Sequence, residues 1–257
     1  MRPLILVTND DGITSPGIRL LVEVAKKFGN VVVVAPDSPQ SAMGHAITIS
    51  SPIRLNKSHI FDDEHVDAYE CSGTPADCVK LAKNFVMKDK VPDLVLSGMN
   101  HGSNTSISVL YSGTMSAAIE AAMNGIPAIG FSLCDWDHEA YLDHTSSWIE
   151  EIVAKAFSNG IEKGVALNVN FPAYSKEKIK GIRVCRQGSA RWDEKFDNRK
   201  DPMGKPYFWM AGDFVNMEDN DETDEWAVTN NYISIVPCQF DMTAYTAHEN
   251  MKESWSK

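Results

Sequence analysis

The sequence predicts an α/β protein with a mostly parallel sheet flanked by helices and a β-rich C-terminal part. Two observations support this fold class. Short all-apolar runs alternate with segments of helical spacing over residues 1–165. Beyond that point, strand-like runs predominate and helical patterns are scarce. We therefore expect a core at residues 1–165 and a β-rich part at residues 166–257 that completes it.

The first βαβ unit has clear start and stop signals. Residues 4–7 are four consecutive apolar residues, which is typical of a buried strand. Ser15 and Pro16 suit the N-cap and first position of a helix, and Gly29 suits its end. A second apolar strand follows at residues 31–35. Two such strands joined by one helix are expected to lie parallel.

The same alternation continues along the core, and turn or capping residues separate the elements. The further elements are expected at a strand over 68–71, a helix from 75 to 85, a strand over 93–97, a helix over 113–123, a strand over 126–133 and a helix over 147–157. In the C-terminal part, strands are expected at 165–171, 181–187, 206–210 and 231–240. Residues 211–226 hold seven acidic residues and no basic one, which predicts a solvated loop.

Charge and cysteine content limit the partners and the compartment. The formal net charge of −11 repels nucleic-acid backbones and anionic lipid, so neither is an expected partner. Five scattered cysteines without C-x-x-C spacing favour free thiols in a reducing compartment. The first apolar run ends after four residues, and no run is long enough to span a membrane. A cytoplasmic location is therefore expected.

Polar residues at the ends of three predicted strands suggest a cation site. Asp10 and Asp11 follow the first strand, Ser41 follows the second, and Asn100 follows the strand at 93–97. Ligand sites of open parallel sheets lie at this edge. Two carboxylates, a hydroxyl and an amide form an all-oxygen set, which suits Mg²⁺ or Mn²⁺. The alternative for the first motif alone is a simple turn sequence.

A loop rich in small polar residues suggests an anion site beside it. The segment SGMNHGSNTSISVLYSGT, residues 97–114, ends where a helix is expected to begin. Free backbone N–H groups and the helix dipole favour phosphate at such a position. Neither a P-loop nor a G-x-G-x-x-G motif occurs, so the sequence does not indicate an ATPase of that class or a dinucleotide enzyme.

Five ordered motifs resemble the SurE (survival protein E) family of metal-dependent nucleotidases. They are TNDDGITSPGI, APDSPQSAMGHAIT, GTPADCV, PDLVLSGMNHGSN and YSGTMSAAIEAA, all within the first 130 residues. A looser similarity continues through GIRVCRQG, DPMGKPYFW and DMTAY. The resemblance implies a Rossmann-like core, homodimers or homotetramers with a C-terminal hairpin arm, and hydrolysis of nucleoside monophosphates by a 5′-nucleotidase. It adds 3′-nucleotides and short polyphosphate as further candidate substrates.

The family's site residues transfer one by one to this sequence. The resemblance implies one divalent cation per subunit, with metal ligands at Asp10, Asp11, Ser41 and Asn100. It implies phosphate-binding residues at Asn104, Ser112, Gly113 and Thr114. One departure is the stretch from Thr105 to Ser108, where many members carry acidic residues and glycine. Loop conformation and substrate preference are expected to differ there.

The expected mechanism is attack by a metal-activated water, with Asp10 and Asp11 as the catalytic carboxylates. A covalent route through Asp10 is the first alternative, although a metal-bound carboxylate is a poor nucleophile. The second alternative is a non-catalytic nucleotide- or phosphate-binding protein with a structural cation. His45 and His101 could donate a proton, but exposed loop histidines are more often solvated.

Four further residues could take part in function, but a simpler role is expected for each. Trp192 and Trp209 could stack a nucleobase, but aromatic residues in β-rich segments more often serve packing or interfaces. Asp77 and Glu120 lie in or beside expected helices. Capping or ion pairing is the simpler expectation for both.

Overall fold

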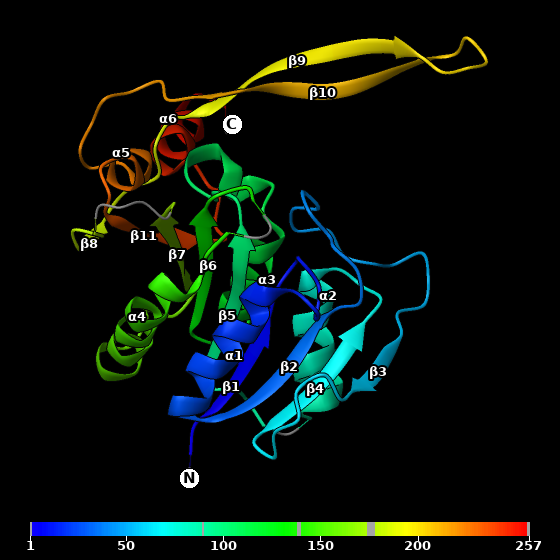
Figure 1. The fold of residues 1–257 in the computed structure, drawn as a ribbon. Coiled ribbons are helices and arrows are strands. Elements are labelled where there is room, and N and C mark those ends of the chain that lie inside the picture. Colours follow the sequence, from blue (N-terminus) through cyan, green and yellow to red (C-terminus); the bar gives the residue numbers. More distant parts are fainter. Residues whose placement is uncertain (1, 89, 138–139, 174–177, 256–257) are drawn as a thin grey trace.

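The computed structural model describes residues 2–88, 90–137, 140–173 and 178–255. Its centre is a nine-stranded sheet (Figure 1). In spatial order the strands are β3 (Leu55–Ser58), β4 (Val66–Cys71), β2 (Asn30–Pro36), β1 (Leu4–Thr8), β5 (Leu94–His101), β6 (Ala128–Cys134), β7 (Val165–Pro172), β11 (Ile233–Gln239) and β8 (Ile182–Val184). The six strands from β4 to β7 are mutually parallel, while β3 and β11 run antiparallel to their neighbours β4 and β7. The predicted α/β class with a mostly parallel sheet is confirmed.

Helices cover both faces of this sheet. They are α1 (Pro16–Phe28), α2 (Pro75–Leu81), α3 (Gly113–Met123), α4 (Ser146–Asn159), α5 (Asp224–Thr229) and α6 (Tyr245–Trp255). Short π- and 3₁₀-helical segments add η1 (Ala82–Val86), η2 (Ser106–Leu110) and η3 (Asp143–Thr145). Helices α1 and α4 pack on one face of the sheet, and α2 and α3 pack on the other.

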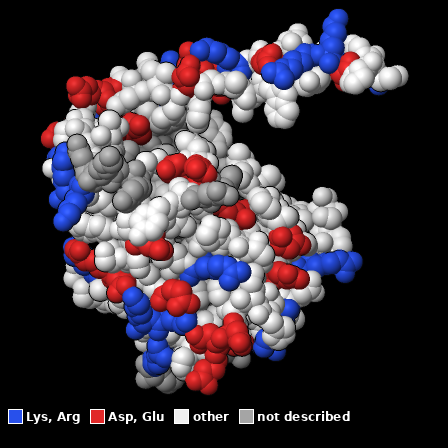
Figure 2. All heavy atoms as spheres, in the orientation of Figure 1, with Lys and Arg blue, Asp and Glu red and all other residues white. Residues whose placement is uncertain are grey.

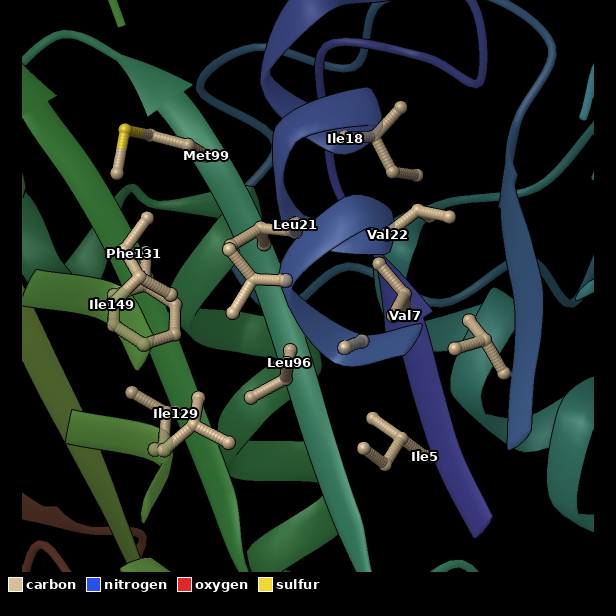
Figure 3. Close-up of a cluster of buried hydrophobic side chains, with 14 of the residues drawn as sticks. Ile5, Val7, Ile18, Leu21, Val22, Leu96, Met99, Ile129, Phe131 and Ile149 are labelled. Carbon is tan, nitrogen blue, oxygen red and sulfur yellow. The ribbon is translucent and has the colours of Figure 1, made fainter. Parts of the chain in front are cut away.

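The two faces follow directly from strand alternation. Ile5 and Val7 of β1 point toward α1, whereas Leu6 between them packs on the face of α2 and α3. Figure 3 shows the first of these clusters, where side chains of α1 and α4 meet those of β1, β5 and β6. Helix α1 approaches β5 closely, because a Cβ at Gly17 would lie 2.0 Å from the carbonyl oxygen of Met99. This contact fixes the end of β5 against the start of α1.

The local signals predicted the first helices well. Ser15 caps α1 with Pro16 at its start, and its hydroxyl accepts a bond from the backbone of Ile18. Asp77 completes a capping box with Thr74 at α2, as its helix-terminal position suggested. The helix expected to reach residue 85 changes to the π-helical η1 after Leu81.

The C-terminal part differs from the prediction in three places. A strand β9 (Arg191–Lys200) pairs with β10 (Pro206–Val215) over ten residues, although only residues 206–210 were expected to form a strand. Helices α5 and α6 were not predicted. The expectation of a wholly solvated loop at 211–226 is wrong, because β10 reaches into this stretch and Asp224 is fully buried at the start of α5. Thr223 caps α5, which orders these acidic residues.

The β9–β10 hairpin projects away from the body of the molecule (Figures 1 and 2). On the face in Figure 2, acidic and basic side chains are interspersed over both the body and the hairpin. Strands β7 and β11 belong to the main sheet, so the C-terminal part contributes to the core. Among the described residues, no helix is both long enough and apolar enough to cross a membrane.

Candidate active site

The candidate site lies at the carboxyl edge of the sheet, between β1, β5 and the start of α3. Asp10 and Asp11 follow β1, and Asn100 lies near the end of β5. The backbone N–H of Gln40 donates to the carbonyl oxygen of Asp10 at 2.7 Å, so the loop after β2 reaches the same edge next to Ser41. The structure therefore brings together the loops that carry all four predicted metal ligands.

Asp10 is buried against the first turn of α3. Asp10 is only 4% exposed, and the Thr114 hydroxyl donates to its Oδ1 atom at 2.5 Å. A Cβ at Gly113 would lie 2.6 Å from Asp10 Cβ, so only glycine permits this approach. Burial and the neighbouring Asp11 charge raise the pKa of Asp10 to about 6, although the Thr114 bond opposes the shift. The carboxylate is thus close-packed and electrostatically unfavourable without a compensating positive charge.

Asp11 is paired with His101 at the end of β5. The Nδ1 atom of His101 lies 3.5 Å from Asp11 Oδ2, and the backbone N–H of His101 donates to the same oxygen at 3.4 Å. His101 is only 6% exposed, so the expectation of a solvated loop histidine is wrong at this position. His45 instead is partly exposed and bonds to Glu120 Oε2 at 3.1 Å. Neither contact appears in the sequence pattern, because both join distant segments.

A bulge in β5 sets the position of Asn100. The β5–β6 register shifts between Ser97 and Asn100. Gly98 has a φ of 121°, and a Cβ there would lie 2.3 Å from the carbonyl oxygen of Phe131. The amide nitrogen of Asn100 donates to the carbonyl oxygen of Gly102 at 2.8 Å. This bond fixes the side-chain amide and leaves its oxygen as the atom that Asn100 can present to a cation.

Ser41 lies on the more exposed loop of the site. The segment 37–48 is fastened by the backbone N–H of Gly44, which donates to Tyr111 at 3.0 Å, and by that of Thr48, which donates to Asp77 Oδ2 at 3.1 Å. Lys80 binds Glu120 Oε1 at 2.7 Å beside the His45 contact. The simpler roles expected for Asp77 and Glu120, capping and ion pairing, are confirmed.

The predicted phosphate-binding residues fall into two environments. Ser112 caps α3 by accepting a bond from the backbone N–H of Met115, so Gly113 and Thr114 form the first turn of α3. The hydroxyl and the backbone N–H of Thr114 both bond to the Asp10 carboxylate. Asn104 is 5% exposed and its amide nitrogen donates to Ser132 at 2.7 Å. The start of α3 can therefore offer the backbone N–H of Gly113 to an anion, while the Asn104 amide nitrogen is engaged by Ser132.

Sequence reasoning missed the carboxylates that support the loop after Asn104. Asp224 accepts the backbone N–H of Ser106 at 2.8 Å and that of Gly188 at 2.9 Å. Glu225 accepts the Thr105 hydroxyl at 2.6 Å. Burial raises the pKa of Asp224 and of Glu225. The carboxylates of α5 thus bond to the Thr105–Ser108 stretch, and only the Thr223–Asp224 capping pattern could have indicated that helix.

The donor set fits a hard divalent cation. Two carboxylates, a hydroxyl and an amide oxygen are carried by loops that meet at this edge, and the buried Oδ1 atom of Asn9 next to Asp10 has no hydrogen-bond partner among the described residues. A cation would offset the repulsion between Asp10 and Asp11. In the described ranges no three His, Cys, Asp or Glu side chains gather as a metal cluster. A cation here would therefore be held partly by neutral oxygens and water.

Comparison with known families identifies this arrangement. Residues 5–194 match the family model described as survival protein SurE. The chain belongs to the SurE family. A relative named 5′-nucleotidase SurE from Cytophaga hutchinsonii is 59% identical, covering 99% of this chain and 97% of the relative. Another SurE relative with the same name, from Bacteroides fragilis, is 42% identical over 99% and 98% of the two chains.

A solved structure supports the same SurE assignment at the level of the fold. The crystal structure of SurE protein from Aquifex aeolicus superimposes with a TM-score of 0.83 at 39% sequence identity. The match covers 98% of this chain and 99% of that one. The SurE architecture therefore includes the C-terminal part as well as the core.

Proposed function

We propose that this protein is a 5′-nucleotidase that hydrolyses nucleoside monophosphates to nucleosides and phosphate, using one divalent cation per subunit. The observation that carries the proposal is the contact between Asp10 and the first turn of α3. An acidic cation site and a phosphate-binding helix start are thereby adjacent. Relatives that share up to 59% identity are named 5′-nucleotidase SurE, which supports the same activity here.

Each residue of the site has a defined task in this proposal. Asp10, Asp11, Ser41 and Asn100 would hold the cation, for which Mg²⁺ or Mn²⁺ is the expected identity. The cation would supply charge neutralisation and a water of lowered pKa. At the start of α3, the backbone N–H of Gly113 binds a phosphate oxygen and stabilises the charge that develops in the transition state, whereas Thr114 is engaged by Asp10. Thr114 keeps Asp10 oriented through its hydroxyl, and Ser112 and Asn104 hold the two ends of the loop in place.

His101 is the best-placed group for a proton transfer. It lies in the same edge as Asp11, at 3.5 Å from the carboxylate, and it is almost fully buried. A histidine oriented by a carboxylate is a suitable general acid or base when it lies within reach of the substrate. His45 is farther from this role, because its ring is engaged by Glu120.

Phosphate release distinguishes this proposal from a non-catalytic binding protein. The purified chain is treated with a chelator, supplied with single metals, and assayed on a panel of 5′- and 3′-nucleoside monophosphates and short polyphosphate. We expect release only with a divalent cation. Asp10→Asn and Asp11→Asn should each reduce kcat by at least about a hundredfold without changing the circular dichroism spectrum. Turnover that survives complete chelation, or a near-wild-type rate in either variant, would contradict the proposed site.

The β9–β10 hairpin is the proposed oligomerisation arm of a homodimer or homotetramer. Four large apolar side chains on it, Phe196, Phe208, Trp209 and Met210, are 58 to 69% exposed. Such a patch on a projecting hairpin is typical of an interface. A Phe208→Ser/Trp209→Ser variant should show a lower mass than wild type by light scattering. A monomeric wild-type protein would exclude the arm's role.

A cytoplasmic location is also proposed, because the five cysteines are free thiols.

A further inference from the structure

An exposed tryptophan, Trp136, lies beside the candidate active site. Trp136 comes two residues after β6 ends at Cys134, so it lies at the same carboxyl edge as Asn100. A Cβ at Gly102 would lie 2.5 Å from Cζ3 of the Trp136 ring, which places the indole directly against the backbone of Gly102. The carbonyl oxygen of Gly102 is the atom that fixes the Asn100 amide. The indole thus contacts Gly102, and Gly102 in turn is bonded to Asn100, a proposed cation ligand.

The Trp136 ring packs against an aromatic side chain of the β9–β10 hairpin but remains exposed. Its centroid lies 6.1 Å from that of Trp192 in an edge-on arrangement, and Trp192 in turn lies 5.5 Å from Phe214. These residues come from the base of β9 and the end of β10. Trp136 nevertheless remains 63% exposed. The packing restricts the ring without burying it, which is the arrangement of a preformed stacking surface.

The proposed substrate matches this surface in chemistry. A nucleoside monophosphate carries an anion at one end and a flat aromatic base at the other. The start of α3 and the two aspartates bind the anionic end in the proposed function. Stacking on an aromatic side chain accepts any base, because every base has a π face.

We propose that Trp136 is the nucleobase-stacking residue of this site, with Trp192 holding its ring in position. This inference rests on the proposed nucleotidase function and names the part of the substrate that the aromatic surface recognises. Trp192, which the sequence offered as a base-stacking candidate, becomes a positioning residue. Trp209 has no such place, because it lies well along the projecting hairpin.

The test compares a substrate that has a base with one that lacks it. Adenosine 5′-monophosphate and ribose 5-phosphate share the phosphate and sugar, so their ratio of kcat/KM isolates recognition of the base. Trp136→Leu should raise KM for the nucleotide about tenfold and leave kcat/KM for ribose 5-phosphate unchanged. Trp136→Phe retains an aromatic face, so it should keep most of the wild-type preference for the nucleotide over ribose 5-phosphate. Phe85→Leu is the control, because Phe85 is also 63% exposed but lies in η1, at the end of the α2 segment remote from its N-terminal cap.

A second measurement separates failure of this inference from failure of the nucleotidase proposal. Adenosine 5′-monophosphate should quench tryptophan fluorescence in the wild type and much less in Trp136→Phe, whether or not turnover occurs. Quenching without turnover would support the stacking residue and contradict the enzyme. Turnover with equal losses for both substrates in Trp136→Leu would show a merely structural role. A change in oligomeric mass in that variant, with an unchanged substrate ratio, would assign the surface to a second copy of the chain and overturn the inference.

Discussion

The two loops that meet at the candidate site are held in different ways. In the loop between β5 and α3, Asn104, Thr105 and Ser106 are at most 5% exposed. Their partners are buried side chains of β6, β7 and α5. The loop after β2 carries Ser41, which is exposed, and it is fastened mainly through its backbone and through His45.

The β5–α3 loop therefore forms a rigid side of the site, and the loop after β2 forms an adjustable side. The β5–α3 loop orients Asn100 and the start of α3 before any ligand arrives, because its polar groups are already satisfied within the protein. The loop after β2 has fewer buried contacts, so it can change position at lower cost. Damage to the first loop should therefore reduce stability, whereas damage to the second should affect ligand binding more than folding.

The largest effect is expected from Asp224→Ala, which removes the support of the buried loop. The backbone N–H groups of Ser106 and Gly188 would lose their acceptor. One buried and one partly buried donor without partners should reduce the free energy of unfolding by about 3 kcal/mol. Urea denaturation of the purified variant measures this change. Asp221→Ala is the control in the same acidic stretch, since Asp221 forms only an exposed pair with Arg183. Equal losses of unfolding free energy in the two variants would contradict the inference that α5 holds the β5–α3 loop rigid.

The next effect is expected from Thr114→Val, which keeps the side-chain shape but removes the bond to Asp10. An Asp10 carboxylate without this donor should lose its orientation, and kcat for nucleotide hydrolysis should fall about thirtyfold. Thr114→Ser retains the hydroxyl and should remain within about threefold of the wild type. Steady-state phosphate release provides the comparison. If valine and serine at this position behave alike, the hydroxyl does not orient Asp10.

A smaller effect is expected from Glu120→Gln, which weakens the fastening of the exposed loop. Burial alone would raise the pKa of Glu120, but bonds from His45 and Lys80 outweigh it and hold the pKa below its ordinary value of 4.5. The carboxylate therefore stabilises the fold above pH 4.5, and this contribution is lost as the pH falls through the lowered pKa.

Urea denaturation at two pH values tests the Glu120 contribution. The variant should lose about 1 kcal/mol at pH 7, and this loss should shrink as the pH falls below 4.5 and through the lowered pKa of Glu120. KM for the nucleotide should rise about threefold at pH 7, with kcat nearly unchanged. Glu151→Gln, which breaks only the exposed pair with Lys155 on α4, should have little effect at either pH. A Glu120→Gln loss that grows toward low pH would reverse the assigned sign.

Much of the core and part of the site could be predicted from local sequence patterns. The first strand, the Ser15–Pro16 helix start and the capping box at Thr74 all depend on neighbours in the chain. The position of Asp10 and Asp11 at the sheet edge follows from the same patterns, because parallel strands end together.

The remaining features depend on contacts between distant residues. The Asp224 bonds to Ser106 span 118 positions, and the Glu120 bond to His45 spans 75. The bulge that sets Asn100 arises from the pairing of β5 with β6, and hydrophobic alternation carries no signal for it. The acidic composition of residues 211–226 even pointed away from burial, since composition reports the average residue and Asp224 is the exception.

The most direct test of the account is a titration of metal-stripped protein with Mn²⁺, followed by electron paramagnetic resonance of the free ion. The account predicts one bound cation per subunit in the wild type, with affinity lost in Asp11→Asn and weakened at least tenfold in Asn100→Ala. Ser41→Ala should weaken binding less, because its loop is the adjustable one. A wild-type protein that binds no Mn²⁺, or an Asp11→Asn variant that binds it equally well, would contradict the cation site.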